Sequence, residues 1–271
     1  DFFDEVLYRL SGWKSRHKAR HTFRLDEASL FLELLDETLP AFVKDGIRKE
    51  LHVIDSAASE PKKHALAALD MFLNLDFAPQ QTLDIPDLET VSKELDKRIG
   101  GNNAAKNMFL AQAARMKHSK SPPETLLLVG PPGTGKTGLT EAYIAALSKE
   151  FPLVRFDLSS LDDSESAGLC GSSRHWSNAD AGSFLRSFYA ENNKLWGACF
   201  FDELDKSSKT IQNAILNLVE RKYFESFLEQ TIVFDNVIFI LAANSLEGLP
   251  PSLLSRVRIV FLQGYSKKEK R

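Results

Sequence analysis

The chain has 271 residues, 43% hydrophobic and 26% charged, the proportions of a soluble globular protein with one large core or two smaller ones. Its net charge of −3 argues against a protein devoted to nucleic acid, and its only two cysteines, Cys170 and Cys199, argue against a disulfide framework. There is no run of about eighteen apolar residues and no secretory leader, so we expect no membrane partner.

These features favour a reducing compartment. We therefore expect a cytoplasmic protein, or a mitochondrial matrix protein if the source is eukaryotic. The sequence starts at Asp1 rather than at a methionine, so we expect a piece of a longer protein.

The first part of the chain is predicted to be helical and without catalytic groups. Apolar residues recur at helical spacing between residues 26 and 76 and predict three helices, with breaks near Pro40 and Pro61. His52 and His64 lie on these helices without a companion at metal-ligand spacing. We expect both histidines at the surface or the edge of the core.

A basic cluster with one aromatic, Trp13–His21, precedes these helices. It is either a contact for DNA or an acidic partner, or simply a solvated helix face or linker. After the helices, the sequence predicts a linker at 78–86, helices at 87–97 and 103–116, and an entry loop at 118–124.

From Leu126 onward, apolar strands alternate with helices, which predicts an α/β fold with a parallel five-stranded sheet flanked by helices. Strands that are apolar on both faces indicate that helices cover both sides of the sheet. The expected strands are 126–129, 153–157, 198–202, 236–242 and 258–262, and the expected helices are 136–149, 181–192, 209–221 and 251–255.

A glycine-rich motif of the form G-x-x-x-x-G-K-T follows the first of these strands and opens a helix, as a phosphate-binding P-loop does. Backbone N–H groups and the positive end of the helix would bind phosphate, with Lys136 at the β- and γ-phosphates and Thr137 on Mg²⁺. The alternative is a Gly/Pro surface turn before an ordinary helix. The predicted nucleotide-binding residues are Gly130, Pro131, Pro132, Gly133, Thr134, Gly135, Lys136 and Thr137, together with Asp202.

The segment Ala198–Lys206 is an apolar strand that ends in carboxylates. We expect Asp202 to hold Mg²⁺ through water and Glu203 to activate the attacking water as general base. The alternative is a strand that simply ends in solvated acids.

Two further residues complete the predicted catalytic set. Asn244 follows the apolar run 237–243, where its amide can contact the γ-phosphate or the lytic water, although Asn is also common at strand ends. Arg256 precedes the last strand and is the candidate arginine finger for a neighbouring subunit, with Arg258 second and a structural salt bridge as the alternative.

The motifs GPPGTGKT, FFDELDK, AAN and LPPSLLSR together resemble those of the AAA+ ATPases, and in detail the ATPase module of Lon proteases. The narrower resemblance rests on three segments. They are Asp163–Gly182, an acidic stretch followed by a Gly-bounded basic and aromatic loop; the run from Pro250 to Ser266; and Leu95–Met116, which resembles the helix entering the Lon ATPase module. The resemblance extends from about Leu66 to Arg271 and is strongest from Leu126.

This resemblance implies a homohexameric ring that uses ATP and Mg²⁺ to thread unfolded protein substrates past a pore loop. The pore-loop residues are Trp176, where the family usually has Tyr, and Ser177, where it usually has an aliphatic residue; Trp176 packing under its loop is the alternative. The family's small helical lid and Ser-Lys peptidase domain match no residues here.

The implied division is a helical N-terminal region at 1–80, a linker with entry helices at 81–124, and an AAA+ large ATPase subdomain at 125–271. Two other functions stay open: an AAA+ ATPase that acts on DNA as a motor, loader or defence protein, and a remodelling ATPase without a protease.

Overall fold

The computed structural model describes residues 40–56, 59–75, 85–118, 121–148, 151–161, 165–192 and 195–263. The chain forms two compact units. Residues 1–79, 167–195 and 224–231 form one, here called the helical unit, and residues 80–166, 196–223 and 232–271 form the other, the sheet unit. The predicted division at residues 80 and 124 follows chain order and stays a prediction.

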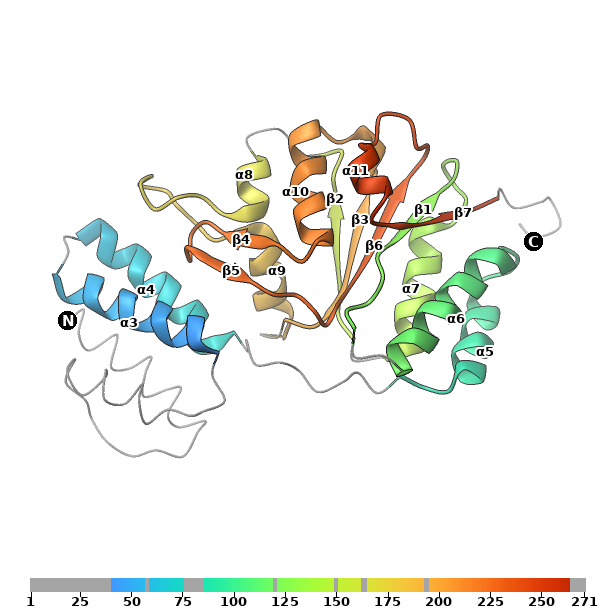
Figure 1. Cartoon of the computed structure of the whole chain (residues 1–271), viewed down its shortest axis with the longest axis horizontal. Coiled ribbons are helices and arrows are strands. Elements are labelled where there is room, and N and C mark those ends of the chain that lie inside the picture. Colours follow the sequence, from blue (N-terminus) through green and yellow to red (C-terminus); the bar gives the residue numbers. More distant parts are fainter. Residues whose placement is uncertain are drawn as a thin grey trace. The chain divides into compact units, whose positions relative to one another are not determined.

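The sheet unit contains a five-stranded parallel sheet with strand order β2-β3-β6-β1-β7 (Figure 1). The register places Leu126 opposite Ile240 on one side and opposite Arg258 on the other. This confirms the predicted fold class. The strands are β1 (Leu126–Val129), β2 (Leu153–Asp157), β3 (Gly197–Asp202), β6 (Val237–Ala243) and β7 (Arg258–Phe261).

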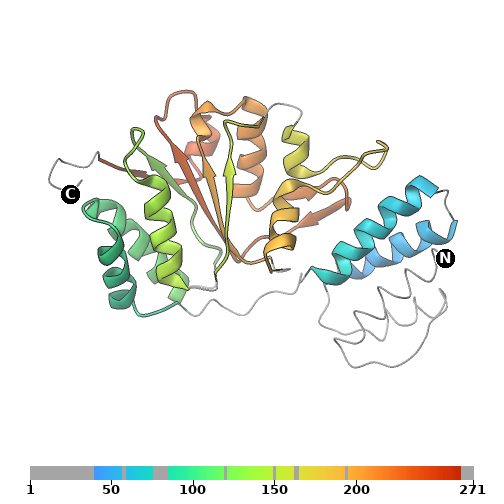
Figure 2. The same ribbon diagram turned by 180° about the vertical axis from the view of Figure 1, so that it is seen from behind.

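The central strands are buried along their whole length because helices cover the sheet on both sides. Every residue of β1 and β6 is buried. One face packs against α5 (Leu88–Arg98), α6 (Asn103–His118) and α7 (Lys136–Leu147), where Phe109 and Tyr143 lie with ring centroids 4.4 Å apart. Figures 1 and 2 show α10 (Lys209–Val219) on the side of the sheet opposite α7.

The helical unit contains a hairpin of two helices, α3 (Ala41–Ser56) and α4 (Ser59–Asn74). Buried side chains recur on α3 at helical spacing, among them Val43, Ile47 and Leu51. Gly46 lets α3 and α4 pack closely together, because a Cβ at that position would lie 2.4 Å from Cζ of Phe72. The first of the three helices predicted for residues 26–76 and the basic cluster at 13–21 lie outside the described residues.

Several short elements were not predicted. They are α8 (Glu165–Cys170), the hairpin of β4 (Tyr223–Glu225) and β5 (Gln230–Ile232), and the 3₁₀ helix η1 (Leu204–Lys206). The predicted helix at 181–192 begins at Ser183 as α9 (Ser183–Asn192), and α11 (Pro251–Leu254) matches its prediction.

Expectations about the histidines, the cysteines, metal ligands and membrane spans can be compared with the described part of the chain. His64 is buried, at 6% exposure, and its Nε2 lies 3.2 Å from the Ser177 carbonyl oxygen, so it is not a surface residue. The described residues contain no cluster of three or more His, Cys, Asp or Glu side chains that could hold a metal ion. Cys170 and Cys199 are free thiols. No helix among the described residues is both long and apolar enough to cross a membrane.

Candidate active site

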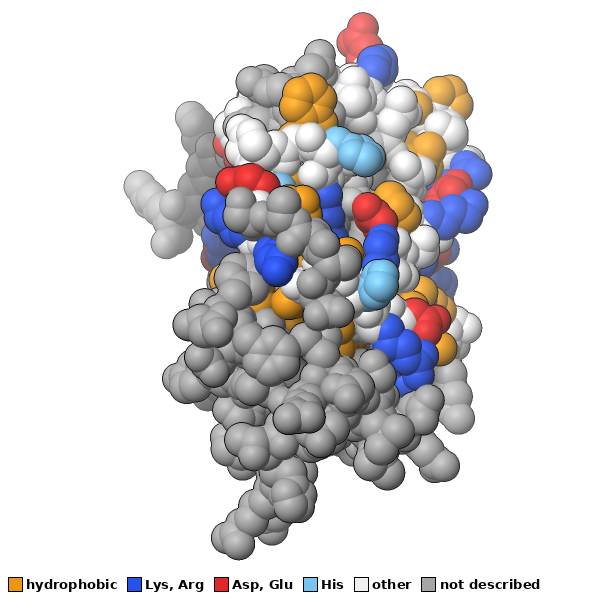
Figure 3. Space-filling view, turned by 90° about the vertical axis from the view of Figure 1, so that its left-hand side faces the viewer, with side chains coloured by type: hydrophobic (Ala, Val, Ile, Leu, Met, Phe, Trp, Pro, Cys, Tyr) orange, Lys and Arg blue, Asp and Glu red, His pale blue; other side chains and the backbone are white. Residues whose placement is uncertain are grey.

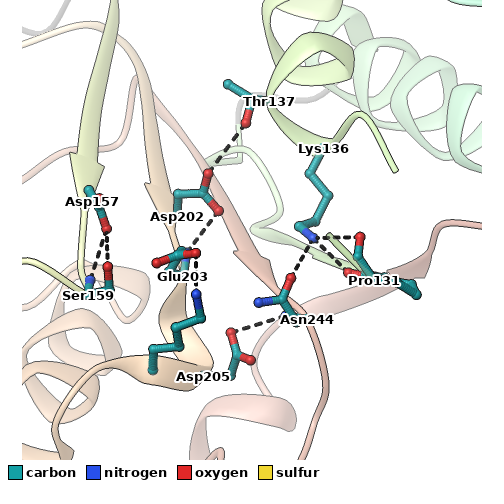
Figure 4. A network of polar contacts seen from close by, with 11 residues as sticks. Pro131, Lys136, Thr137, Asp157, Ser159, Asp202, Glu203, Asp205 and Asn244 are labelled. Carbon is teal, nitrogen blue, oxygen red and sulfur yellow. Dashed lines mark hydrogen bonds and ion pairs between the residues drawn. The ribbon is translucent and has the colours of Figure 1, made fainter. Parts of the chain in front are cut away.

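The predicted phosphate-loop residues, the Asp202–Glu203 pair and Asn244 converge where three neighbouring strands end. The pairing of Val129 with Ala243, and of Phe201 with Leu241, brings the ends of β1, β3 and β6 to one edge of the sheet. Figure 4 shows that side chains from these three ends face one another. The topology therefore assembles residues from positions 130 to 244 into a single polar cluster.

The loop after β1 has the backbone that a phosphate cradle needs. Gly133 and Gly135 have φ values of +77° and +81°, a region that side chains disfavour. Gly130 donates its N–H to the Ala243 carbonyl at 3.2 Å, and a Cβ there would lie 2.8 Å from the Leu262 carbonyl oxygen. Gly135 also caps the N-terminus of α7, whose free N–H groups suit an anion.

The ammonium group of Lys136 is buried and contacts only neutral oxygens among the described residues. Its Nζ donates to the Gly130 carbonyl at 2.6 Å, the Pro131 carbonyl at 3.3 Å and Asn244 Oδ1 at 3.0 Å (Figure 4). Burial lowers its pKa, against the pull of nearby carboxylates. No ion pair in the described part of the chain includes Lys136, so its charge fits an anionic ligand such as a nucleotide phosphate.

Thr137 and Asp202 lie together, as the predicted Mg²⁺ site requires. Thr137 Oγ1 is 3.4 Å from Asp202 Oδ2, and the other carboxylate oxygen of Asp202 accepts the Glu203 N–H at 2.8 Å. Hydroxyl and carboxylate oxygens are the ligands that Mg²⁺ prefers, usually with waters completing its shell. The donor set therefore fits the ion.

Glu203 has a strained backbone and a restrained side chain. Its φ of +56° is rare for a residue with a Cβ, and such strain concentrates at functional sites. Lys206 Nζ donates to Glu203 Oε1 at 2.5 Å. That hydrogen bond, with a second from Ser159, lowers the pKa of Glu203 and keeps the carboxylate ionised, as a general base must be.

A hydrogen bond between the ends of two strands positions Asn244. Asp205, on η1 after β3, accepts the backbone N–H of Asn244 at 3.1 Å. Asp205, Lys206 and Ser159 were not predicted as site residues. For the first two, the signal was present in the sequence, because both stand in the same acidic segment as Asp202 and Glu203.

Arg256 lies on the turn after α11 and forms an ion pair with Glu220 at the end of α10. Its Nη1 also donates to the Ser252 carbonyl at 2.8 Å, and its side chain remains 44% exposed. The structural salt bridge considered as an alternative is thus present within the chain. Arg258 Nη1 lies 3.8 Å from Glu124 Oε1.

Trp176 and Ser177 belong to the helical unit, on a loop between Gly171 and Gly182. Trp176 is 69% exposed, so it does not pack under its loop. Hydrogen bonds between Ser172 and Asp180 close the base of this loop, at 3.0 Å between backbone atoms. The aromatic side chain is therefore presented outward by a closed loop.

Known Lon proteases are similar to nearly all of this chain. The chain is 29% identical over 260 residues to a Lon protease of Mycoplasma genitalium, and 28% identical over 257 residues to Lon protease 2 of Borreliella burgdorferi. Each alignment covers 90% of this chain and 32% or 31% of the relative. The chain thus spans about a third of the length of these relatives.

A third relative, a Lon protease of Brevibacillus choshinensis, is 29% identical over 257 residues, with 91% of this chain and 32% of the relative covered. These relatives confirm the resemblance predicted from the sequence. A sequence model of the ATPase family associated with various cellular activities (AAA) matches residues 126–265, which is more than half of the 271 residues. That match contains the phosphate loop, the carboxylates at the end of β3, Asn244 and Arg256. The chain therefore belongs to the AAA family of ATPases, and this membership implies nucleotide binding.

Proposed function

We propose that this chain is the ATP-hydrolysing module of a Lon-type machine, which couples ATP hydrolysis to the unfolding and translocation of protein through a hexameric ring. The observation that carries the proposal is the convergence of Lys136, Asn244 and the Asp202–Glu203 pair at the ends of adjacent strands. The relatives that span 90% of the chain are Lon proteases, which supports the narrower assignment.

Each group has a role in this proposal. The residues from Gly130 to Thr137 hold the phosphates of ATP, and Lys136 moves from its neutral acceptors to the β- and γ-phosphates. Thr137 and Asp202 would hold Mg²⁺, which would neutralise charge on the phosphates. Glu203 takes the proton of the attacking water, and Asn244 orients that water or the γ-phosphate.

Arg256 and Trp176 extend the proposal to an assembly. Arg256 of one subunit stabilises the transition-state charge at the site of its neighbour, after leaving Glu220. Trp176 and Ser177 contact the unfolded polypeptide, since a large exposed aromatic on a polar loop suits contact with a chain. A hexamer, protein substrates and a cytoplasmic location, or a matrix location in a eukaryote, belong to this proposal.

The test is Glu203→Gln, compared with Glu247→Gln, which removes an exposed carboxylate from the turn after β6. Loss of the base should reduce ATP turnover by about 10²-fold or more while ATP still binds. A nucleotide-binding titration and a phosphate-release assay measure the two properties separately. Brisk hydrolysis by Glu203→Gln would falsify the assignment of the base.

The rival function, a motor or loader on DNA, rested on the basic cluster at residues 13–21, which lies outside the described residues. On the face seen in Figure 3, basic and acidic side chains of the described residues are interspersed rather than gathered by sign. Stimulation of ATP hydrolysis by unfolded casein favours the Lon-type proposal. Stimulation by duplex DNA with a steep salt dependence favours the rival.

A further inference from the structure

The helical unit contains a buried charge that the proposed ATPase cycle does not use. Glu50 lies on α3 with 0% exposure, and its Oε2 accepts a hydrogen bond from Arg174 Nη1 at 2.7 Å. The two residues are 124 positions apart in the sequence. A carboxylate without access to water is destabilising unless a partner compensates it, so this contact fixes Arg174 strongly.

Arg174 is held on more than one side. Its Nε donates to the Phe227 carbonyl, and its guanidinium lies over the Phe227 ring at 5.1 Å from the centroid. Its side chain is only 14% exposed. Within the described residues, Arg174 Nη2 and Glu50 Oε1 are buried without a hydrogen-bond partner, and a bidentate pairing would join these same two atoms.

A second tether lies on the other side of the exposed tryptophan. His64 of α4 is 3.2 Å from the Ser177 carbonyl oxygen, and since a carbonyl only accepts, Nε2 carries the hydrogen. The His64 ring also meets the Phe227 ring edge to face, at 5.9 Å between centroids. The loop is thus attached to α3 just before Trp176 and to α4 just after it.

We infer that Glu50 is a positioning residue for the loop between Gly171 and Gly182: through Arg174, and together with His64, it lets the α3–α4 hairpin fix the direction in which Trp176 is presented. This inference rests on the proposed function, because it assigns regulation to the same loop. Its physical basis is that two polar contacts, each made by a buried side chain of the hairpin, bracket one exposed aromatic. On this inference, the α3–α4 hairpin helps to orient the residue that contacts the substrate.

The first measurement follows Trp176 itself. The chain has three tryptophans, so replacing Trp13 and Trp196 by Phe leaves Trp176 as the only indole. In that background of this chain, Glu50→Gln should lower the fluorescence anisotropy of Trp176 and increase its quenching by acrylamide. The matched control is Asp45→Asn, which breaks an exposed ion pair with Arg48 on the same helix.

The second measurement is ATP hydrolysis as a function of unfolded casein concentration. A mispositioned loop should raise the KM for casein by about tenfold, with a smaller change in maximal stimulated rate. The Asp45→Asn control should show the parent KM. An unchanged KM and unchanged anisotropy in Glu50→Gln would overturn the inference.

The double variant Glu50→Gln with Arg174→Gln separates positioning from folding. A single substitution leaves one buried charged group without its partner and lowers stability. The double variant removes both charges and should recover much of the melting temperature. If Glu50 positions the loop, the double variant keeps the high KM and the mobile Trp176. If the pair is merely structural, anisotropy and KM recover together with stability, and the inference fails.

The proposed function and this inference can fail separately. If casein does not stimulate ATP hydrolysis by the parent protein, the proposed function fails. The anisotropy of Trp176 still tests whether Glu50 positions that residue. If casein stimulates the parent and every variant alike, the proposed function stands and the positioning role is excluded.

Discussion

Lys136 and Asn244 are joined directly, with Lys136 Nζ donating to Asn244 Oδ1 at 3.0 Å. They come from different strand ends, after β1 and after β6, so the pairing of these strands creates the contact. A γ-phosphate would compete with the amide oxygen for the same ammonium. The contact therefore links occupancy of the phosphate site to the freedom of Asn244.

Two substitutions of Asn244 should differ in their effect on ATP binding. Asn244→Asp places an anion beside Lys136, and the new ion pair should weaken ATP binding by about tenfold or more because it competes with phosphate. Asn244→Ala removes the competing acceptor, so ATP binding should be retained while turnover falls. Calorimetric titration with a slowly hydrolysed ATP analogue, beside a turnover assay, checks both; equal affinities in the two variants would contradict the competition.

The pKa of Glu203 predicts a shift in pH dependence. The hydrogen bond from Lys206 lowers this pKa, so the base stays ionised to lower pH than an ordinary glutamate. Lys206→Met removes that bond, which raises the pKa of Glu203 and moves the acid limb of the kcat/KM profile for ATP to higher pH. Lys93→Met, which removes an exposed helical ion pair with Glu89, is the control. An acid limb that stays in place would argue against Glu203 as the base.

Trp176 can be tested by side chains of graded size. Trp176→Ala should abolish the stimulation of ATP hydrolysis by unfolded casein, because the exposed aromatic contact is lost. Trp176→Tyr, which restores the aromatic usual in the Lon family, should keep most of the stimulation. Equal stimulation of the Ala and Tyr variants would remove Trp176 from the substrate contact.

The parts of the fold that were predicted have strong local signals. Buried strands such as β1 and β6 are continuous apolar runs, and the phosphate loop and Asn244 directly follow them. The carboxyl ends of parallel strands meet at one edge, so the convergence of Lys136, Asp202 and Asn244 could be anticipated from order alone.

What could not be predicted depends on distant partners. Glu50 looks like a solvated residue of an amphipathic helix, and only the fold places Arg174 against it. The β4–β5 hairpin lacks the Asn-Gly or Gly-rich turn that marks short hairpins, and Glu229 takes a positive φ there instead. Likewise the partner of Arg256 is a carboxylate at the C-terminal end of α10, 36 positions earlier in the chain.

Gly171, at the base of the loop that carries Trp176, should tolerate no side chain. Its φ is +79°, and a Cβ would lie 2.0 Å from Glu225 Oε1 and 3.0 Å from the Gly182 nitrogen. Glu225 itself is buried and accepts the Gly182 N–H at 3.1 Å, so it cannot move away without losing that bond. Gly171→Ala should therefore destabilise the helical unit well beyond the strain of the backbone alone.

Gly248 provides the control for that prediction. It has nearly the same φ, +80°, and no atom lies within 4 Å of the position that a Cβ would take there. Gly248→Ala should lose only about 1 kcal/mol, the strain of a left-handed residue. Chemical denaturation of both variants checks the difference; equal losses would show that the contact with Glu225 relaxes without cost.

Arg256 is proposed to act on a neighbouring subunit, although in a single chain it pairs with Glu220. Arg256→Ala should lower ATP turnover by about 10³-fold, the usual contribution of an arginine finger. Arg258→Ala, whose side chain faces Glu124 instead, should lose far less and serves as the matched control.

Mixing two inactive variants distinguishes action in trans from action in cis. Arg256→Ala subunits keep their own Glu203, and Glu203→Gln subunits keep Arg256, so a mixed assembly contains sites with both groups. Hydrolysis should reappear on mixing and vary with the ratio of the two proteins, because only sites between unlike subunits are complete. If every mixture stays inactive although the subunits co-assemble, Arg256 serves its own chain, and its ion pair with Glu220 is then its structural role.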